Sequence, residues 1–402
     1  MKIGHIADIH WGLGYSGPTA TARFDDICRT MDWVADRMIA EGCDIVIVAG
    51  DMFRKADIAL EKASKEIRAC TAWLRKLTAV GIEIVIISGT PSHDPISAYE
   101  LLKDYQLPKV TIATEPIWYD YDGECGFSIV CIPGMDRSSF VSKEEYRGLP
   151  AHVVHQMMTD HITETCQEFR RESNYSPTIL VSHMTYDLAE TGFEDVLMQQ
   201  EAILTTDAVA GYDLVTLGHI HRPQQNGNVF YSGSPERLSF NDEKVDAGFW
   251  IHEWDGQKFD SRFIDTPARR FVTYKLDEFG VKMVIEDSLC WDWDEGDEED
   301  HGPCPKDAVV RIHYTCSEEL NRQLNRRTLE KSLYDAGAYY VSEIKGDVKR
   351  SEDRLRDAEI TEALGPIDAL RKWANNQESE PAEIEELAAM TAELLEVPAD
   401  AL

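Results

Sequence analysis

The sequence predicts an α/β protein of two or three domains, which is the number that its 402 residues favour. Short apolar runs of strand length alternate with helical patterns over the first 265 residues, and this alternation favours a sheet core with helices on its faces. Five of these runs end just before residues of the types that bind metal ions. Because parallel strands place their sites at their carboxyl ends, residues from distant parts of the chain can converge on one sheet edge.

Each of these five predicted strands is followed within a few residues by a candidate metal ligand. In chain order, Ile3–Ala7 precedes Asp8 and His10, Asp44–Ala49 precedes Asp51, Ile82–Ile87 precedes His93, Thr178–Ser182 precedes His183, and Asp213–Leu217 precedes His219 and His221. Asp8 and His10 are two residues apart, so an extended segment presents both on the same side, and His219 and His221 repeat this spacing.

Helices are expected between these strands. Ala20–Glu41 has apolar residues at helical spacings of three and four, and Gly42 ends it. Ile58–Val80 is a second helix that ends before Gly81. Two further helices are expected over residues 95–104 and 149–172, and short β pieces at 228–231 and 248–253 complete this part of the chain.

The pattern changes near Pro267. Segments 270–276 and 308–314 are predicted strands, 317–336 a polar helix and 338–344 another strand, which together indicate a small α+β domain. Residues 351–402 are charged and helical, with breaks at Gly365-Pro366 and within 375–381. We therefore expect three parts, at residues 1–265, 266–348 and 349–402.

Charge and composition limit the possible functions. The net charge of −33 is unusual for a polyanion binder, which is normally basic. Three explanations stay open: the acid lies away from the site, bound metal ions invert the local field, or the substrate is not a nucleic acid. Part of the acid is concentrated between Glu286 and Asp307, which contain ten Asp or Glu residues and one Lys.

The location is expected to be cytoplasmic. No stretch approaches the roughly 20 apolar residues that span a bilayer, and the start leads directly into a strand rather than a signal peptide. The nine cysteines are scattered without a C-x-x-C pair, which favours reduced thiols. Membrane association is not expected.

The ligand types point to phosphate ester chemistry. Imidazoles and carboxylates suit Mn²⁺, Fe²⁺, Zn²⁺ or Mg²⁺. Cleavage of a phosphate ester needs an activated water and a clamp on the phosphoryl oxygens, and two metals about 3.5–4 Å apart supply both. Asp51, which stands alone after its strand, is the candidate for a bridging carboxylate.

In this order, the motifs resemble those of the calcineurin-like metallophosphoesterases: D-x-H, G-D, G-N-H-D, a later His, and G-H-x-H. The chain also resembles the SbcD-type DNA repair nucleases, because Gly50–Phe53 is similar to their G-D-L-F and Tyr231–Phe240 to their Y-x-G-S-P-E-R-x-S-F. The resemblance is strong as far as Phe240 and looser after it. It implies a β-sandwich flanked by helices, a small α+β capping domain and C-terminal helices.

The resemblance also implies roles. One metal, in the family Mn²⁺, would be held by Asp8, His10, Asp51 and His221, and the other by Asp51, His183 and His219, while His93 would act as general acid. The candidate catalytic residues are His93, Arg54 and Asp94. Two positions depart from the family: Ser92 replaces an Asn that ligates the second metal, so Ser92, water or Thr90 is the candidate there, and Arg54 replaces a His near the phosphate. An Arg can clamp phosphate but cannot donate a proton near neutral pH.

Interaction surfaces are also candidates. Arg322, Arg326, Arg327 and Lys331 share helical spacing, and they are either DNA phosphate contacts or a solvated face balanced by nearby acids. Ile384, Leu387 and Leu394 form an apolar stripe on the last helix, which is either packed or a docking site for an SbcC-like ABC-type coiled-coil ATPase, the partner that the resemblance implies. Family members also form dimers, for which helices 20–41 and 58–80 are candidates. Asp25 and Asp26 are either partners of a ligating His or part of a solvated face.

The leading interpretation is a Mn²⁺-dependent DNA nuclease of SbcD type that acts as a 3′–5′ exonuclease and single-strand endonuclease in double-strand break repair. The enzymatic alternative is a phosphodiesterase for small nucleotides or phosphoesters. The alternative from another class is a degenerate phosphoesterase that serves as a scaffold, which Ser92 alone supports.

Overall fold

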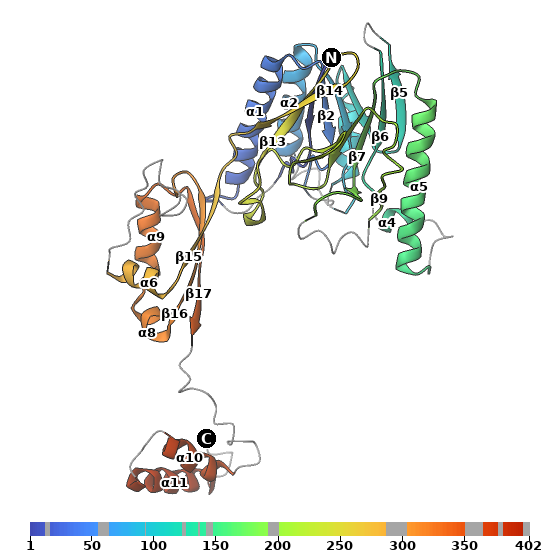
Figure 1. Cartoon of the computed structure of the whole chain (residues 1–402). Coiled ribbons are helices and arrows are strands. Elements are labelled where there is room, and N and C mark those ends of the chain that lie inside the picture. Colours follow the sequence, from blue (N-terminus) through green and yellow to red (C-terminus); the bar gives the residue numbers. More distant parts are fainter. Residues whose placement is uncertain are drawn as a thin grey trace. The chain divides into compact units, whose positions relative to one another are not determined.

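In the computed structural model, the first part of the chain forms two six-stranded sheets, each mainly parallel (Figure 1). The first sheet has the order β14-β13-β1-β2-β3-β4, with bounds Phe259–Asp265, Gly248–Trp254, Lys2–Ile6, Ile45–Ala49, Glu83–Ile87 and Val110–Ala113. The second has the order β11-β12-β10-β7-β6-β5, with bounds Gln224–Asn226, Val229–Tyr231, Leu214–Gly218, Thr178–His183, Phe127–Ile132 and Ile117–Tyr121. A two-stranded sheet pairs β8 (Thr185–Tyr186) with β9 (Ile203–Leu204).

The structure describes residues 1–12, 17–54, 64–92, 94–122, 126–135, 137–141, 148–191, 201–286, 304–349, 365–376 and 381–396. It divides into two compact units, of which the first comprises Met1–Tyr274, Cys290–Ile312 and Arg327–Ile344, and the second Lys275–Leu289, His313–Arg326 and Lys345–Leu402. The three-part division at residues 265 and 348 stays a prediction.

The apolar core lies in three layers within the first unit. Residues of the two sheets that face each other, among them Ile47, Val85 and Val181, form the cluster between the sheets. The alternate residues of the first sheet, such as Val46 and Ile84, pack against helices on its outer face. Burial of each such side chain contributes about 1.5–3 kcal/mol. The strands are therefore buried on both faces, which explains their nearly continuous apolar runs.

Helices cover the outer faces of both sheets (Figure 1). On the first sheet these are α1 (Ala22–Glu41), α2 (Ser64–Ala79) and α3 (Ile96–Asp104). On the second sheet α5 (Ala151–Glu172) follows the short α4 (Arg137–Phe140). Helix α1 ends at Gly42, whose φ of 70° lets its N–H reach the carbonyls of Met38 and Ile39. The described part of helix α2 begins at Ser64, and the start of the predicted helix, 58–63, lies outside the described residues.

A three-stranded sheet with the order β15-β16-β17 follows the sandwich in the chain, with bounds Phe271–Leu276, Val309–Ser317 and Tyr340–Lys349. Its helices are α6 (Glu278–Ile285), α8 (Glu318–Gln323) and α9 (Arg326–Asp335). The prediction of one continuous helix over 317–336 is wrong, because Leu324 leaves the helical region with ψ 113° and is buried instead.

The C-terminal segment has two helices among the described residues, α10 (Pro366–Asn376) and α11 (Pro381–Glu396). Both begin with a proline, which suits the first turn of a helix because that residue's N–H has no partner there. Most of the acidic segment 286–307, and residues 351–364, lie outside the described residues. Among the described helices, none combines the length and the hydropathy that a bilayer crossing requires.

Candidate metal centre

The carboxyl ends of β1, β2, β7 and β10 meet and bring most of the predicted ligands together. The chain leaving β1 stays paired with the chain leaving β2, since Asp8 N–H donates to Gly50 O at 3.2 Å and His10 N–H to Asp51 O at 3.1 Å. From the second sheet, His183 ends β7, and His219 follows β10. His219 N–H lies 3.1 Å from Asp8 Oδ2. The two sheets therefore contribute to one site.

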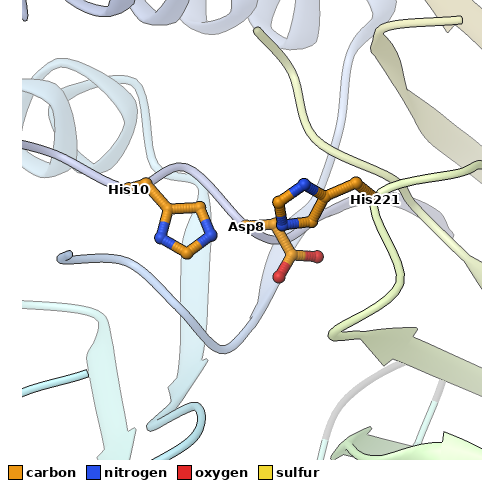
Figure 2. A group of neighbouring side chains, drawn as sticks. All are labelled: Asp8, His10 and His221. Atoms are coloured by element: carbon orange, nitrogen blue, oxygen red, sulfur yellow. The ribbon is translucent and has the colours of Figure 1, made fainter. Parts of the chain in front are cut away.

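Two overlapping groups of side chains in this site have the composition of metal sites. Asp8, His10 and His221 each offer one ligand atom within 4.8 Å of the others. Figure 2 shows the imidazole of His221 directed toward the Asp8 carboxylate, with His10 on the other side. Asp8, Asp51 and His183 form the second group under the same limit. Asp8 is thus common to both.

Asp51 also reaches both groups, as expected for a bridging carboxylate. Its Oδ2 lies 3.8 Å from His10 Nε2, and its Oδ1 lies 3.3 Å from His183 Nε2. The same Oδ1 accepts a hydrogen bond from Thr90 N–H at 2.9 Å. The carboxylate is therefore fixed from behind while it faces both groups.

The backbone is strained where these ligands lie. Asp8, His10, Asp51 and His219 all have positive φ, at 53°, 52°, 48° and 92°. A non-glycine residue there costs of order 1 kcal/mol or more, and such residues concentrate at functional sites. The left-handed residue turns the chain sharply at the end of the strand, so the side chain points into the site.

Glycines make room for the ligands. A Cβ on Gly50 would lie 2.3 Å from His183 Nδ1, and one on Gly89 would lie 1.9 Å from Asp51 Oδ1. Neither ligand could keep its position beside a larger residue. The glycines of the two motifs are therefore explained by close packing against the ligands.

The contacts of the two ring nitrogens of His183 are those of a metal ligand. Its Nδ1 lies 2.7 Å from the carbonyl of Ala49, so Nδ1 carries the proton and donates to it. Its Nε2 is buried, has no hydrogen-bond partner among the described residues, and faces Asp51. A ring held by a carbonyl at one nitrogen, with the other nitrogen facing carboxylates, is the usual arrangement of a ligating histidine. The donor set therefore fits divalent cations.

His219 has a different environment from the one expected. The family pattern assigns it to the same metal as Asp51 and His183, but it is not in either group. Its ring packs edge-on against His183, with centroids 5.4 Å apart, and its Nε2 lies 3.0 Å from Glu201 Oε2. Glu201 therefore lies within ion-pair distance of one ring nitrogen of His219.

The charges in the site shift the pKa values of its groups. Burial lowers the pKa of His183, but the charges of Asp51 and Asp8 outweigh it and raise that pKa to about 10. Burial likewise lowers the pKa of His221, whereas its pairing with Asp242 and the charge of Asp8 raise it to about 9. Burial raises the pKa of Asp8, and nearby Asp51 adds to this. The cluster attracts positive charge, which protons or cations can supply.

The loop between β3 and α3 contains Asp94, one of the predicted catalytic residues. Asp94 is fully buried, and its carboxylate accepts from Gly89 N–H at 2.7 Å, from Phe53 N–H at 3.1 Å and from the Tyr99 hydroxyl. Burial and the charge of Asp51 raise its pKa to about 7. Asp94 therefore holds two ligand loops together, and this geometry describes a positioning residue. A direct catalytic role for it stays a prediction.

The remaining members of this part of the site are less closely defined. Ser92 is exposed in the turn that follows Thr90, and Arg54 is half-buried directly after Phe53. His93, the predicted general acid, lies outside the described residues. The roles proposed for these three residues stay predictions.

The segment Tyr231–Phe240, the most discriminating motif, supports the site from behind. Ser234 Oγ donates to the carbonyl of Asp8 at 2.8 Å. Glu236 is completely buried, accepts from the Thr30 hydroxyl at 2.8 Å and lies 3.2 Å from Arg23 Nη2. The motif therefore fixes a ligand loop onto α1.

Asp26 belongs to the same buried charge cluster. Its carboxylate binds Arg23, Arg29 and, through two bonds of 2.6 Å, Arg269. The suggestion that Asp26 orients a ligating histidine is therefore wrong, because its oxygens are already engaged by arginines. The alternative of a solvated face fails as well, since the side chain is buried. Asp25 instead accepts from the Thr21 hydroxyl.

The predicted DNA contacts are partly balanced by acids. Arg322 lies 3.6 Å from Glu318, and Lys331 lies 2.6 Å from Asp335. Arg326 donates to the Tyr314 hydroxyl at 2.7 Å. Arg327 lies next to it in α9. The two alternatives, phosphate contact and balanced solvated face, both stay open.

The predicted docking stripe needs a correction. Ile384 is buried, as are Ala374 and Ala388, so it is not available on the surface. Leu387 is exposed, together with Trp373 of α10 and Met390. The side chain of Leu394 lies outside the described residues. The exposed apolar surface of the two helices therefore differs from the stripe that helical spacing alone indicates.

Two carboxylates near the site are not indicated by any sequence motif, Glu201 beside His219 and Asp242 beside His221. Asp242 could have been noticed, because it lies two residues after the discriminating motif. Glu201 has no comparable local signal. Both matter because each contacts one histidine of the G-H-x-H motif.

Comparison with known proteins agrees with this geometry. A family model described as "Calcineurin-like phosphoesterase" matches residues 1–223. The "DNA double-strand break repair protein Mre11" of Aeropyrum pernix is 26% identical over 56% of this chain and 49% of its own length. The SbcD component of the SbcCD nuclease of Rhodobacter capsulatus is 24% identical over 64% of this chain and 67% of its own. The same component from Escherichia coli K12 is 24% identical over 60% and 62%.

The chain thus spans between half and two thirds of the length of these relatives. Among solved structures, a dimetal phosphatase from Danio rerio gives a TM-score of 0.38 with 9% identity, over 66% of this chain and 97% of that one. Likeness at that level adds nothing to the argument from the site.

Proposed function

The chain belongs to the calcineurin-like phosphoesterase family, and on that premise we propose that it is a two-metal DNA nuclease of SbcD type. Its proposed activities are 3′–5′ exonuclease and single-strand endonuclease cleavage in double-strand break repair. The observation that carries the proposal is the pair of overlapping groups, Asp8 with His10 and His221, and Asp8 with Asp51 and His183. The nuclease relatives support the choice of DNA as substrate.

Two divalent cations would supply a clamp on the phosphoryl oxygens and lower the pKa of a bound water. The chain's own residues would hold and orient them. Asp8, His10 and His221 would hold one cation and Asp51 with His183 the other, with Asp51 reaching both groups. Arg54 would bind a phosphate oxygen, and His93 would donate a proton to the leaving oxygen.

We propose Mn²⁺ as the cation, with Mg²⁺, Fe²⁺ and Zn²⁺ as alternatives. Ligands that combine three or more imidazoles with carboxylates suit the transition metals better than Mg²⁺, which prefers an all-oxygen environment. Ser92 would bind more weakly than an amide oxygen, so the second cation would exchange more readily. A metal content below about one ion per chain in Mn²⁺ buffer would favour a scaffold instead.

The partners follow from the same proposal. DNA would be contacted by Arg322 of α8 and by Arg326, Arg327 and Lys331 of α9. An SbcC-like ABC-type coiled-coil ATPase would bind the C-terminal helices. The exposed residues Trp373, Leu387 and Met390 are the candidates there, since a large exposed apolar surface marks an interaction site. A homodimer through α1 and α2 and a cytoplasmic location are the remaining parts of the proposal.

The test is hydrolysis by the full chain of linear DNA and of bis-p-nitrophenyl phosphate, each with Mn²⁺ and with Mg²⁺. The proposal expects Mn²⁺-dependent release of nucleotides from DNA 3′ ends, and a large loss of this activity in His93→Ala. Turnover of the small ester without any cleavage of DNA would favour the small-substrate phosphodiesterase. Undiminished DNA cleavage by His93→Ala would contradict the general-acid assignment.

A further inference from the structure

Asp242 lies beside the metal-site residue His221 although no metal motif includes it. Its Oδ1 is 3.6 Å from His221 Nδ1, an ion-pair contact slightly longer than a hydrogen bond. The other ring nitrogen of His221 is on the side of Asp8 (Figure 2). Nδ1 of His221 therefore faces Asp242, which lies behind the ring. The other nitrogen faces Asp8, which lies in the site.

The orientation of Asp242 is fixed by the backbone. Its Oδ2 accepts from Leu238 N–H at 2.8 Å and from Ser239 N–H at 3.0 Å. Ser239 Oγ in turn accepts from Asn241 N–H, so the two side chains cap the 3₁₀ turn η3, Phe240–Asp242, reciprocally. With Oδ2 engaged in this way, Oδ1 is the oxygen directed at His221.

The turn itself is held on its other side. The ring of Phe240 packs edge-on against Phe271, with centroids 4.9 Å apart, and the guanidinium of Arg311 lies 4.2 Å from its centroid. The next residue, Glu243, accepts from Thr273 N–H at 2.7 Å. Asp242 is therefore carried by a rigid turn that is anchored on β15.

A carboxylate behind a histidine decides which nitrogen carries the proton. An oxygen at Nδ1 favours the tautomer with the proton on Nδ1, and the lone pair is then on Nε2, the atom on the Asp8 side. His183 shows the same arrangement, with the carbonyl of Ala49 at its Nδ1. The two histidines thus present equivalent nitrogens to the site by different means.

We propose that Asp242 is a positioning residue that fixes the tautomer and orientation of His221, so that Nε2 binds the cation shared with Asp8 and His10. This inference rests on the proposed two-metal function. It adds a residue outside the motifs to the machinery of the site and makes the η3 turn part of it.

Asp242→Asn is the sharpest variant. Its amide oxygen can keep both backbone hydrogen bonds, which places the NH₂ group where Oδ1 was. An NH₂ donor at Nδ1 forces the proton onto Nε2, where it blocks ligation. Loss of such a partner weakens metal binding by about 10–100-fold. Calorimetric titration of the full chain with Mn²⁺ measures this, while thermal unfolding in EDTA establishes that the variant is folded.

The matched control is Asp277→Asn. Asp277 also caps a helix, with Oδ1 accepting from Gly280 N–H at 2.9 Å, so this variant removes the same charge from a similar capping position. It is expected to leave the Mn²⁺ affinity unchanged.

A double-mutant cycle separates positioning from a merely structural role. If Asp242 acts through His221, adding Asp242→Asn to His221→Asn causes no further loss of Mn²⁺ affinity. Losses that add in the cycle, or parent-like affinity of Asp242→Asn, would overturn the proposal. If Asp242→Asn does not fold, Asp242→Glu replaces it, because the longer side chain cannot keep both the backbone hydrogen bonds and the contact with Nδ1. Parent-like Mn²⁺ affinity of Asp242→Glu would also overturn the proposal. A parent chain that binds no Mn²⁺ would contradict the proposed function itself.

Discussion

The metal centre and the cluster around Asp26 and Glu236 are equally buried and equally rich in charge, yet they are built in opposite ways. In the cluster, Asp26 and Glu236 are paired with arginines and backbone N–H groups. In the metal centre, no arginine or lysine among the described residues lies within ion-pair distance of Asp8, and His183 Nε2 faces Asp8 and Asp51 without a hydrogen bond. A buried charge that other protein groups neutralise indicates a structural role. A buried charge that a bound cation would neutralise indicates a functional site.

The backbone conformation also distinguishes the metal centre from the cluster around Asp26 and Glu236. Four ligand positions of the metal centre have left-handed φ, while Arg23 and Asp26 lie within the regular helix α1. Strain is tolerated where it directs a side chain into the site, and it is absent where charges pair across elements. The predictions below test this contrast.

The largest effect is expected from Asp51→Asn. Removing the carboxylate that reaches both metal groups should lower Mn²⁺-dependent hydrolysis of DNA by at least about 10²–10³-fold, the scale of losing one electrostatic group in an active site. Stability in EDTA should change by less than about 1 kcal/mol, since the amide oxygen still accepts from Thr90. Single-turnover assays and urea unfolding measure the two quantities. A large loss of stability would mean that the centre is structural.

Asp26→Ala should instead lower the free energy of unfolding. It leaves Arg269 without its carboxylate partner and Arg23 with Glu236 alone, and breaking a buried pair costs about 3–5 kcal/mol. Urea unfolding of the chain in EDTA is the measurement. Arg37→Ala is the control, because its ion pair with Glu41 is on the surface and contributes at most about 1 kcal/mol. Equal losses in both variants would remove the distinction between the cluster and the surface.

Cation binding should stabilise the parent chain more than a variant of the metal centre. Mn²⁺ at 100 times its dissociation constant adds about 2.7 kcal/mol per site to the free energy of unfolding. Thermal unfolding with and without Mn²⁺ should show this gain in the parent and in Arg37→Ala, and a smaller gain in Asp51→Asn. The same gain in Asp51→Asn would place the bound cations elsewhere.

The last prediction concerns a third kind of buried polar group, the neutral pair His5 and His252. His5 Nε2–H donates to Leu217 O at 3.1 Å, and His252 Nε2 lies 3.4 Å from His5 Nδ1. Burial lowers the pKa of His5 to about 3, and that of His252 well below its usual value. A pKa lowered by folding means that the unfolded chain binds more protons. The stabilisation is therefore complete above about pH 6.5 and is lost as the pH falls toward 3.

The measurement is urea unfolding in EDTA between pH 7 and 5. The free energy of unfolding should decline by up to about 1.4 kcal/mol per pH unit for each histidine. His252→Gln should show roughly half the decline of the parent. Identical slopes in the two proteins would mean that the pair does not stay neutral in the folded chain.

Much of the fold and of the site follows from local patterns in the sequence. The five strands that precede the candidate ligands were predicted within a residue or two, because burial on both faces gives them nearly continuous apolar runs. The spacing of Asp8 and His10 and the position of His183 at a strand end were enough to place them in one site. The edge strands β4, β5, β11 and β14 were missed, since they are partly exposed and mixed in composition. Strand β6 was missed as well, although Phe127–Ile132 is an apolar run that is buried on both faces.

What the sequence could not show is long-range pairing. Arg23 and Glu236 are 213 positions apart, and nothing local indicates that they meet. Glu201 and Asp242 contact the histidines of G-H-x-H only once the fold has formed, and the tautomer of each ring depends on those contacts. The exposed face of α11 was also misjudged, because helical spacing does not tell which side of α11 is buried, and Ile384 lies on the buried side.

The most direct test of the central claim is crystallography of the chain soaked in Mn²⁺, with anomalous data at the manganese edge. The account predicts two anomalous peaks about 3.5–4 Å apart, one among Asp8, His10 and His221 and the other beside Asp51 and His183. No peak at this edge of the sheets, or a single peak that does not touch Asp51, would contradict it.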